Sequence, residues 1–398
     1  MNLDGISRGA KIKGINLLGT GDFTFRKWLD ELKKTLEPAG DGLFKYNDVF
    51  FMLTTEVSTI FSFEGKTKKV HHLIHVPSFE IVDQINECLL KYGKLEADGR
   101  PTLIVSASEL VEKIIEISND VILTSAHIWT PWFSLFGSKS GFDRVEDCYQ
   151  DQTKNIFSLE TGLSSNPAMN WRLSSLDKFT LMSNSDSHSP NPWRLGREAN
   201  VFELKKLSFK EIYEAIKEKD RKRFLFTIEV PPQLGKYHYT GHRNCEISMS
   251  PTDGISVNNI CPRCKRGLTV GVEQRVEELA DRPKDFVPKD AIPFKTLISL
   301  YELISYALGI NQLYSQKVNS EQNKLIEIFG NELEILLNVP EEKLREVTEE
   351  KIVEMIMKNR EGTIDVVPGY DGVYGKIARG DEKEVKFKID QSSLRKFL

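Results

Sequence analysis

The stretch Asn184-Ser185-Asp186-Ser187-His188-Ser189-Pro190 follows a short apolar run, residues 179–182, that has the composition of a β-strand. Residues two positions apart on an extended chain point to the same face, so Asp186 and His188 can bind one metal ion together. A turn capped by the aspartate beside a surface histidine is the structural alternative. Five further ligand-type residues stand at the ends of earlier apolar runs, and this repetition favours a metal site.

Six strand-like runs in the first half of the chain end in aspartate, glutamate or histidine. Reactive residues at the C-terminal ends of parallel strands are typical of a (β/α) barrel. We therefore predict an α/β barrel over residues 1–229, opening on a helix at residues 2–13 with no strand before it. The candidate metal ligands, in chain order, are Asp22, Glu56, His72, His127, Glu160, Asp186 and His188.

The predicted ligand set mixes carboxylates and imidazoles and is larger than one ion needs. Such a mixture suits two or three divalent ions such as Zn²⁺ or Mn²⁺. Clustered ions hold the attacking and leaving oxygens of a phosphodiester and acidify a bound water, so hydrolysis at phosphorus is the expected chemistry. In the run 69–76, an extended chain turns His72 to one face and turns His71 and His75 to the other, where one of the two can be structural.

A second group of ligand-type residues follows Pro231-Pro232. His242-Arg-Asn-Cys245 and Cys261-Pro-Arg-Cys264 are separated by 15 residues, which is the spacing of a zinc ribbon or knuckle. Short spacers let both ligands of a pair reach the same ion, so we predict a structural zinc site, with free thiols as the alternative. We assign residues 230–283 to a zinc-binding domain and residues 284–398, which are rich in helical patterns, to a helical C-terminal domain.

The composition is that of a globular protein with two or three domains. Of 398 residues, 28% are charged and 40% hydrophobic, and no apolar run approaches the length of a membrane span. No signal-peptide pattern follows Met1, and five unevenly spaced cysteines do not suit a disulfide framework, so we expect a cytoplasmic location. A net charge of −4 neither requires nor excludes nucleic acid, because a binding face needs only local basicity.

Several segments spread over nearly the whole chain carry a resemblance to a known family: Thr54-Thr-Glu-Val57, Ser125-Ala-His-Ile-Trp-Thr-Pro-Trp132, Asn184-Ser-Asp-Ser-His188, the cysteine pairs, and the segments 276–283 and 368–372. They resemble the PHP (polymerase and histidinol phosphatase) family and, within it, the endonuclease Q family. It implies a distorted (β/α)7 barrel, a zinc-knuckle domain and a helical C-terminal domain. It also implies a DNA repair endonuclease that uses Zn, Mn or Mg ions and cuts 5′ to deaminated bases (uracil, hypoxanthine, xanthine) or to abasic sites.

The N-terminus departs from the family pattern. The family begins with a strand that carries His-x-His, and this sequence contains none, so the first barrel strand is missing. Either the protein starts upstream of Met1 or two metal ligands have been lost. The loss of two imidazoles would weaken or empty one metal position, and the missing strand would leave an exposed edge in the barrel.

We expect the aromatic loop from Trp129 to Arg144 to meet DNA. Trp129 and Trp132 can stack on or wedge beside a base, and Lys139 and Arg144 can hold phosphates, with a lid packed on the barrel as the alternative. Two other functions stay open: a phosphatase for small phosphomonoesters, which needs neither a zinc domain nor a helical tail, and a catalytically impaired DNA-binding module. The sequence specifies no helicase or sliding-clamp partner.

Overall fold

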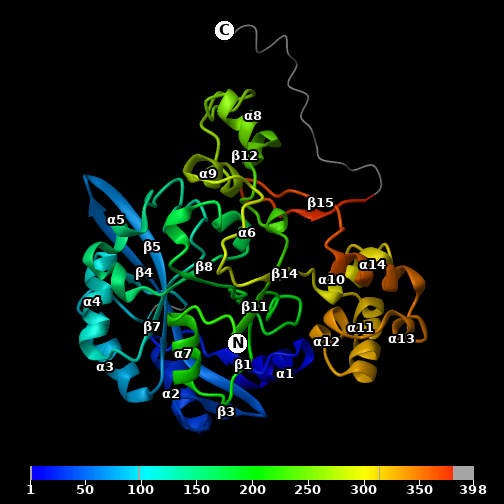
Figure 1. Cartoon of the computed structure of the whole chain (residues 1–398), viewed down its shortest axis with the longest axis horizontal. Coiled ribbons are helices and arrows are strands. Elements are labelled where there is room, and N and C mark those ends of the chain that lie inside the picture. The colour runs from blue at the N-terminus through cyan, green and yellow to red at the C-terminus, as the bar shows by residue number, and fades with distance from the viewer. Residues whose placement is uncertain (1, 97–98, 313, 380–398) are drawn as a thin grey trace.

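The computed structural model describes residues 2–96, 99–312 and 314–379. Figure 1 shows a large mixed α/β body, coloured blue to green, with a yellow and orange helical body beside it. A smaller yellow-green module stands at one end of the α/β body. No helix in the described ranges is long and apolar enough to cross a membrane.

A nine-stranded mixed sheet forms the α/β body, with strands β1 (Leu17–Gly19), β2 (Glu37–Pro38), β3 (Phe44–Tyr46), β4 (Val49–Phe63), β5 (Lys66–Val76), β6 (Thr102–Leu103), β7 (Ile122–Ser125), β8 (Ser158–Glu160) and β9 (Thr180–Met182). The order is β2-β3-β4-β5-β7-β8-β9, and β1 and β6 also pair with β4. The sheet curls without closing, because β9 pairs only with β8 among the described strands. This curled half-barrel confirms the predicted fold class, a distorted α/β barrel.

Strands β4 and β5 form one long antiparallel hairpin, which corrects the prediction of two short strands in a parallel barrel. The first was expected to end at Glu56, but β4 runs for 15 residues and continues to Phe63. Glu64 and Gly65 make the turn with positive φ angles of 49° and 73°, as a two-residue turn that follows the strand twist requires. Glu56 and the histidines of β5 therefore lie in mid-strand.

Parallel pairing, as predicted, relates β7, β8 and β9. All residues of these three short strands are buried, which suits parallel strands covered on both faces. Their C-terminal ends lie at one edge of the sheet, so the residues that follow each strand are brought together there.

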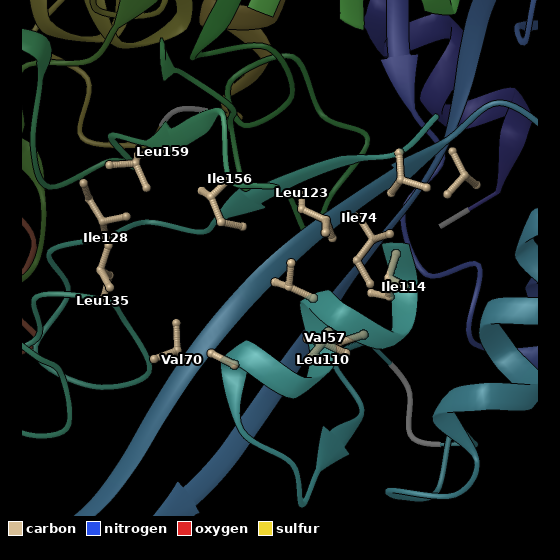
Figure 2. Packing of buried hydrophobic residues seen from close by; sticks show 14 of the residues in the cluster. Val57, Val70, Ile74, Leu110, Ile114, Leu123, Ile128, Leu135, Ile156 and Leu159 are labelled. Carbon is tan, nitrogen blue, oxygen red and sulfur yellow. The ribbon is translucent and has the colours of Figure 1, made fainter. Parts of the chain in front are cut away.

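Helices pack around this sheet: α1 (Leu3–Lys13), α2 (Arg26–Thr35), α3 (Phe79–Leu89), α4 (Ala107–Ile117), α5 (Val145–Tyr149), α6 (Pro167–Asn170) and α7 (Phe209–Lys217). Ser106 caps α4 by accepting the Glu109 N–H. Figure 2 shows apolar side chains of β4 and β5 meeting the apolar face of α4, among them Val57, Leu110 and Ile114, each at most 1% exposed. One face of the hairpin thus packs in the hydrophobic core against α4, and the opposite face can carry polar residues.

A second, three-stranded sheet links the α/β body to the helical body, with β10 (Ala199–Phe202), β11 (Phe224–Glu229) and β14 (Phe294–Thr296). The helical C-terminal region has the predicted character and contains α10 (Leu300–Ala307), α11 (Gln316–Phe329), α12 (Glu332–Leu337), α13 (Glu341–Arg345) and α14 (Glu350–Glu361). It ends in a short antiparallel pair, β15 (Val366–Val367) and β16 (Lys376–Ile377).

The small module contains the strands β12 (Thr240–His242) and β13 (Ile247–Met249) and the helices α8 (Pro251–Ser256) and α9 (Val272–Leu279). Its own apolar core is small and includes Ile247, Met249, Cys261 and Leu268. A core of this size gives little hydrophobic stabilisation, so the module depends on other interactions.

Candidate metal centre

Three side chains meet on the face of the hairpin that α4 does not cover. The Glu56 Oε1 atom lies 2.9 Å from His71 Nδ1 and 3.2 Å from His127 Nε2. The two histidine nitrogens are 3.0 Å apart. One ligand atom from each residue lies within 4.8 Å of the others, which is close enough for all three to bind a common ion.

The hairpin register decides which histidine reaches this centre. Glu56 and His71 share one face of the antiparallel pair, and His72 points to the opposite face. There the His72 ring is buried, with Nε2 2.9 Å from Thr59 Oγ1 and Nδ1 3.0 Å from the Tyr149 hydroxyl. His72, which was predicted as a metal ligand, is therefore a packing residue, and His71 is the histidine of β5 that lies beside Glu56 and His127.

The ends of the parallel strands supply the rest of the centre. Glu160, at the end of β8, accepts the His127 backbone N–H at 2.6 Å and the Asn184 side-chain N–H at 2.8 Å. His127 has a φ of 27°, and Gly162 lies so close behind it that an added Cβ would come within 2.6 Å of the His127 Cβ. Thr130 Oγ1 lies 3.0 Å from His127 Nδ1. Glu160, Gly162 and Thr130 together orient the His127 ring.

Three other predicted ligands, Asp22, Asp186 and His188, lie near Glu56, His71 and His127. Among the described residues, they are outside the group whose ligand atoms all lie within 4.8 Å of one another. Charges on Asp22 and Asp186 act on Arg100, whose guanidinium lies 3.3 Å from Glu56 Oε1. His188 Nε2 is 3.4 Å from Asp186 Oδ1, and the His188 side chain is 71% exposed. Asp22 and Asp186 have positive φ angles of 48° and 40°, a strained backbone that is concentrated at functional sites.

The electrostatics of the centre fit a cation. Burial opposes ionisation of Glu56, but hydrogen bonds from His127 and His71 outweigh it and hold the pKa of the carboxyl well below its usual value. Burial also opposes a charged His127, yet the hydrogen bond and charge of Glu56 raise its pKa to about 9. Burial lowers the pKa of His71, and burial raises the pKa of Glu160 to about 7.

The Glu56 carboxylate thus requires positive charge beside it, which an imidazolium or a divalent ion can supply. Two imidazole nitrogens and a carboxylate oxygen are a donor set that Zn²⁺ and Mn²⁺ accept. The hydrogen bonds that Glu160 makes to His127 and Asn184 are of the kind that orient metal ligands. The described residues therefore fit a divalent metal ion.

The aromatic loop after β7 divides into a buried and an exposed part. Trp129 is only 1% exposed, donates its indole N–H to Asn170 at 2.8 Å and packs 4.8 Å from the Phe136 ring. The prediction that Trp129 meets DNA is therefore wrong, and the packed-lid alternative holds for this residue. The other predicted DNA contacts are exposed, namely Trp132, Lys139 and Arg144.

The predicted zinc ligands converge in the small module. One ligand atom each from His242, Cys245, Cys261 and Cys264 lies within 4.8 Å of the others. The Cys264 Sγ atom is 3.3 Å from His242 Nδ1. Three thiols and one imidazole are a donor set that structural zinc sites use, so this group can hold a metal ion as predicted from the spacing.

Two residues of the centre were missed by sequence reasoning. His71 was set aside for its neighbour, although continued strand alternation from Glu56 through the Glu64-Gly65 turn pointed to it. Arg100 lies in a loop between Gly99 and Pro101, and no sequence pattern distinguishes it from other charged loop residues.

The fold and the centre define a class: an open α/β half-barrel with a candidate metal centre, joined to a module with a separate cysteine–histidine cluster. Among solved structures, the chain matches the lesion-specific endonuclease PfuEndoQ from Pyrococcus furiosus with a TM-score of 0.85 and 36% identity, covering 96% of this chain and 91% of that one. It matches an endonuclease Q complex with a 27-mer duplex substrate, with an abasic lesion at the active site, at a TM-score of 0.85 and 35% identity, covering 97% and 94%. This chain belongs to the endonuclease Q family.

The chain also matches one family model and two sequence relatives. Residues 299–363, which contain α10 to α14, match the family model described as the MJ0043 C-terminal domain. The chain is 34% identical over 280 residues to the uncharacterized protein MJ0043 of Methanocaldococcus jannaschii, covering 69% of this chain and 34% of that protein. It thus spans about a third of the length of that relative. It is also 28% identical over 374 residues to the uncharacterized protein YqxK of Bacillus subtilis, covering 92% and 89%.

Proposed function

We propose that this chain is a metal-dependent DNA repair endonuclease. It hydrolyses the phosphodiester on the 5′ side of deaminated bases (uracil, hypoxanthine or xanthine) or of abasic sites. The observation that carries the proposal is the meeting of Glu56, His71 and His127, within a chain aligned over 96% of its length with a lesion-specific endonuclease. Hydrolysis of a phosphodiester is chemistry that such a donor set supports when it holds a divalent ion.

Glu56, His71 and His127 would hold a Zn, Mn or Mg ion, with further ligands drawn from Asp22, Glu160, Asp186 and His188. A bound divalent ion supplies an acidified water and neutralises charge on the phosphate. Arg100, which lies against Glu56, adds a fixed positive charge for a phosphate oxygen. Glu160 and Thr130 keep the His127 ring in place, so the ligand geometry does not reorganise during the reaction.

The rest of the chain has supporting roles in this proposal. Trp132, Lys139 and Arg144 are exposed on the loop beside the centre and contact damaged DNA. The cysteine–histidine group holds a structural zinc ion. The division into a catalytic barrel (1–229), a zinc-binding domain (230–283) and a helical domain (284–398), and a cytoplasmic location, belong to the same proposal.

Cleavage of labelled duplexes tests the function. Duplexes of one sequence carry a single uracil, hypoxanthine, xanthine or abasic site, and an undamaged duplex serves as the control, each with Mn²⁺, Mg²⁺ or Zn²⁺. We expect a nick 5′ to the lesion, none in the control duplex, and none with the His71→Ala variant. Binding of lesion DNA without cleavage in any metal would instead indicate a binding module, and turnover of histidinol phosphate without nicking would indicate a phosphatase.

A further inference from the structure

The segment 189–196 follows the candidate ligands Asp186 and His188 (the ligand pair) and contacts two other parts of the chain. One contact is with α1, and the other is with α10, the first helix of the helical body. The ligand pair itself belongs to no helix or strand. Packing does not fix the His188 side chain, because it is 71% exposed. The direction of the ligand pair therefore depends on what holds the segment 189–196.

Two glycines of α1 allow the first contact. Gly5 and Gly9 are buried and stand four residues apart, so they lie on the same face of the helix. A Cβ added at Gly9 would come within 2.1 Å of the Pro190 carbonyl oxygen and within 3.1 Å of Leu195 Cδ2. A Cβ added at Gly5 would meet the Pro190 ring only at 3.4 Å, an ordinary contact. The close approach of the segment to α1 thus requires glycine at position 9.

Local preference does not explain a glycine at this position. Alanine is favoured over glycine inside a helix, and Gly9 lies in the interior of the 11-residue helix α1. The far end of the segment also touches α1, since a Cβ added at Gly196 would come within 2.8 Å of Lys13 Cγ. Lys13 in turn forms a buried ion pair with Glu332 of α12, and Figure 1 shows α1 beside that helix. The surface that receives the segment is therefore itself fixed.

An aromatic contact holds the other side of the segment. The Trp193 ring meets the Tyr301 ring of α10 edge to face, with centroids 4.9 Å apart, and packs against the core of the helical body. Leu195, two residues further on, is buried in the core of the α/β body. Neighbouring side chains of one short segment are thus anchored in two different cores.

Hydrogen bonds connect the anchored segment to the ligand pair. The Ser187 hydroxyl, between the two ligands, donates to the Ser189 carbonyl oxygen at 2.6 Å. On the other side, Arg197 Nη2 donates to the Ser185 carbonyl oxygen at 3.4 Å. A displacement of the segment therefore moves the ligand pair with it.

We propose that Gly9 and Trp193 are positioning residues, which hold the segment 189–196 so that the ligand pair faces the candidate metal centre. Neither residue is a metal ligand or touches the reacting atoms. The inference rests on the proposed function and adds residues outside the centre that set its geometry. Groups that orient metal ligands commonly change metal affinity when they are altered, although they do not touch the ion.

Titration of the full chain with Mn²⁺, with free Mn²⁺ measured by electron paramagnetic resonance, tests the α1 contact. Gly9→Ala should weaken Mn²⁺ binding roughly tenfold, because the added Cβ displaces the Pro190 backbone. Its urea midpoint should stay close to that of the wild type, because the helical preference of alanine offsets strain. For an abasic duplex, kcat for nicking should fall by a similar factor without a change in KM.

The matched control is the same substitution one helical turn earlier. Gly5→Ala should bind Mn²⁺ like the wild type, because only the end of the Asn2 side chain, 3.0 Å from the added Cβ, has to move.

Variants of Trp193 test the α10 contact independently. Trp193→Ala should also weaken Mn²⁺ binding roughly tenfold, because the segment loses its anchor in the helical body. Trp193→Phe keeps a ring against Tyr301 and should recover most of the affinity. Phe329→Ala removes another partly buried ring packed against the same core and should leave Mn²⁺ binding unchanged.

The outcomes separate this inference from the proposed function. Wild-type Mn²⁺ affinity in Gly9→Ala and Trp193→Ala would overturn the positioning roles, even if the wild type nicks lesion duplexes. Weaker binding in these two variants, with wild-type affinity in Gly5→Ala and Trp193→Phe, supports the roles even if no duplex is nicked in any metal. An equal loss in the controls, or a loss that only accompanies a lower urea midpoint, would indicate a general structural effect and contradict the inference.

Discussion

At the scale of the residue, the candidate centre depends on which of two adjacent histidines faces Glu56. The sequence indicates ligand-type residues by their positions in apolar runs, but it does not specify the pairing partner of each strand. The register in which β4 pairs with β5 decides whether His71 or His72 shares a face with Glu56, and this pairing is a tertiary property. The sequence therefore predicted that a histidine of this strand faces Glu56. The choice between His71 and His72 required the structure of the hairpin.

The adjacent histidines give a matched pair of variants. His71→Ala should lower metal-dependent nicking by at least about 100-fold with little change in the urea midpoint, because it removes a ligand on the open face. His72→Ala should lower the free energy of unfolding by roughly 2–4 kcal/mol, because it leaves a cavity and removes the partner of a buried hydroxyl. Nicking by refolded His72→Ala should stay within a few-fold of the wild type.

The reverse pattern, with His72→Ala inactive but stable and His71→Ala active, would contradict the placement of the two histidines. Both variants are assayed on the same abasic duplex, with circular dichroism to establish that each is folded.

Arg100 offers a second test at this scale. Arg100→Ala should reduce kcat/KM for nicking by on the order of 100-fold, because a fixed positive charge that stabilises the reacting phosphate is lost. Arg100→Lys keeps the charge without the paired donors and should recover part of the activity. Exposed Arg144 is the control, and Arg144→Ala should mainly raise KM. Unchanged steady-state kinetics in Arg100→Ala would remove this residue from the site.

At the scale of the element, the sequence pattern predicted the parallel strands β7 to β9 and missed the hairpin β4–β5. Short runs ending in His127, Glu160 and Asp186 were predicted as parallel strands, and β7, β8 and β9 are parallel. The hairpin was missed because the predicted strand was ended at Glu56, where a ligand was expected to mark the strand end. Residues 57–63 in fact continue the same strand. The Glu64-Gly65 turn was the available signal.

The contact of α1 with α12 joins the first helix to the helical body. Lys13 Nζ lies 2.6 Å from Glu332 Oε1, and both side chains are 1% exposed. Lys13→Ala should lower the free energy of unfolding by roughly 3–5 kcal/mol, because it leaves a buried carboxylate without its counter-charge. The double variant Lys13→Met with Glu332→Gln should recover most of this loss, since no unpaired charge remains. Additive effects in urea unfolding would show that the two residues do not interact.

A buried carboxyl between β8, β9 and β11 gives a pH-dependent prediction. Burial raises the pKa of Glu229 to about 8, against hydrogen bonds from Thr227 and Thr161. Between about pH 4.5 and 8, the folded chain keeps a proton that the unfolded chain releases, so stability falls as the pH rises through this window. Glu229→Gln should change stability little at pH 5 and raise it at pH 8.5 by on the order of 1–3 kcal/mol relative to the wild type.

Urea midpoints measured across this pH range check the prediction. The control Glu116→Gln alters a carboxylate whose side chain is 55% exposed and should follow the wild-type profile. A Glu229→Gln profile parallel to that of the wild type would mean that the carboxyl is already ionised in the folded chain.

At the scale of the whole molecule, the described chain comprises an α/β body, a helical body and a small module with a cluster of cysteine and histidine side chains. The two Cys/His pairs predicted a local cluster because two-residue spacers confine both ligands to one turn, whatever the rest of the chain does. The arrangement of the strands was supplied by resemblance to a family, since alternation and composition cannot choose between an open and a closed sheet.

Metal removal should affect the small module first. Metal analysis of the purified chain should find one zinc per chain that Cys261→Ser releases, whereas Cys88→Ser, outside the cluster, should retain it. Cys261→Ser should also open residues 240–268 to proteolysis, because the small apolar core there cannot replace the bound ion. Full zinc content in Cys261→Ser would contradict the assignment of the four ligands.

The central claim is that Glu56, His71 and His127, from β4, β5 and the end of β7, bind a catalytic divalent ion together. The most direct measurement is anomalous diffraction at the manganese edge from crystals soaked in Mn²⁺. The account predicts a peak in contact with the Glu56 carboxylate and with the rings of His71 and His127, and no contact with His72. A peak bound elsewhere, or one that includes His72 and leaves His71 free, would contradict it.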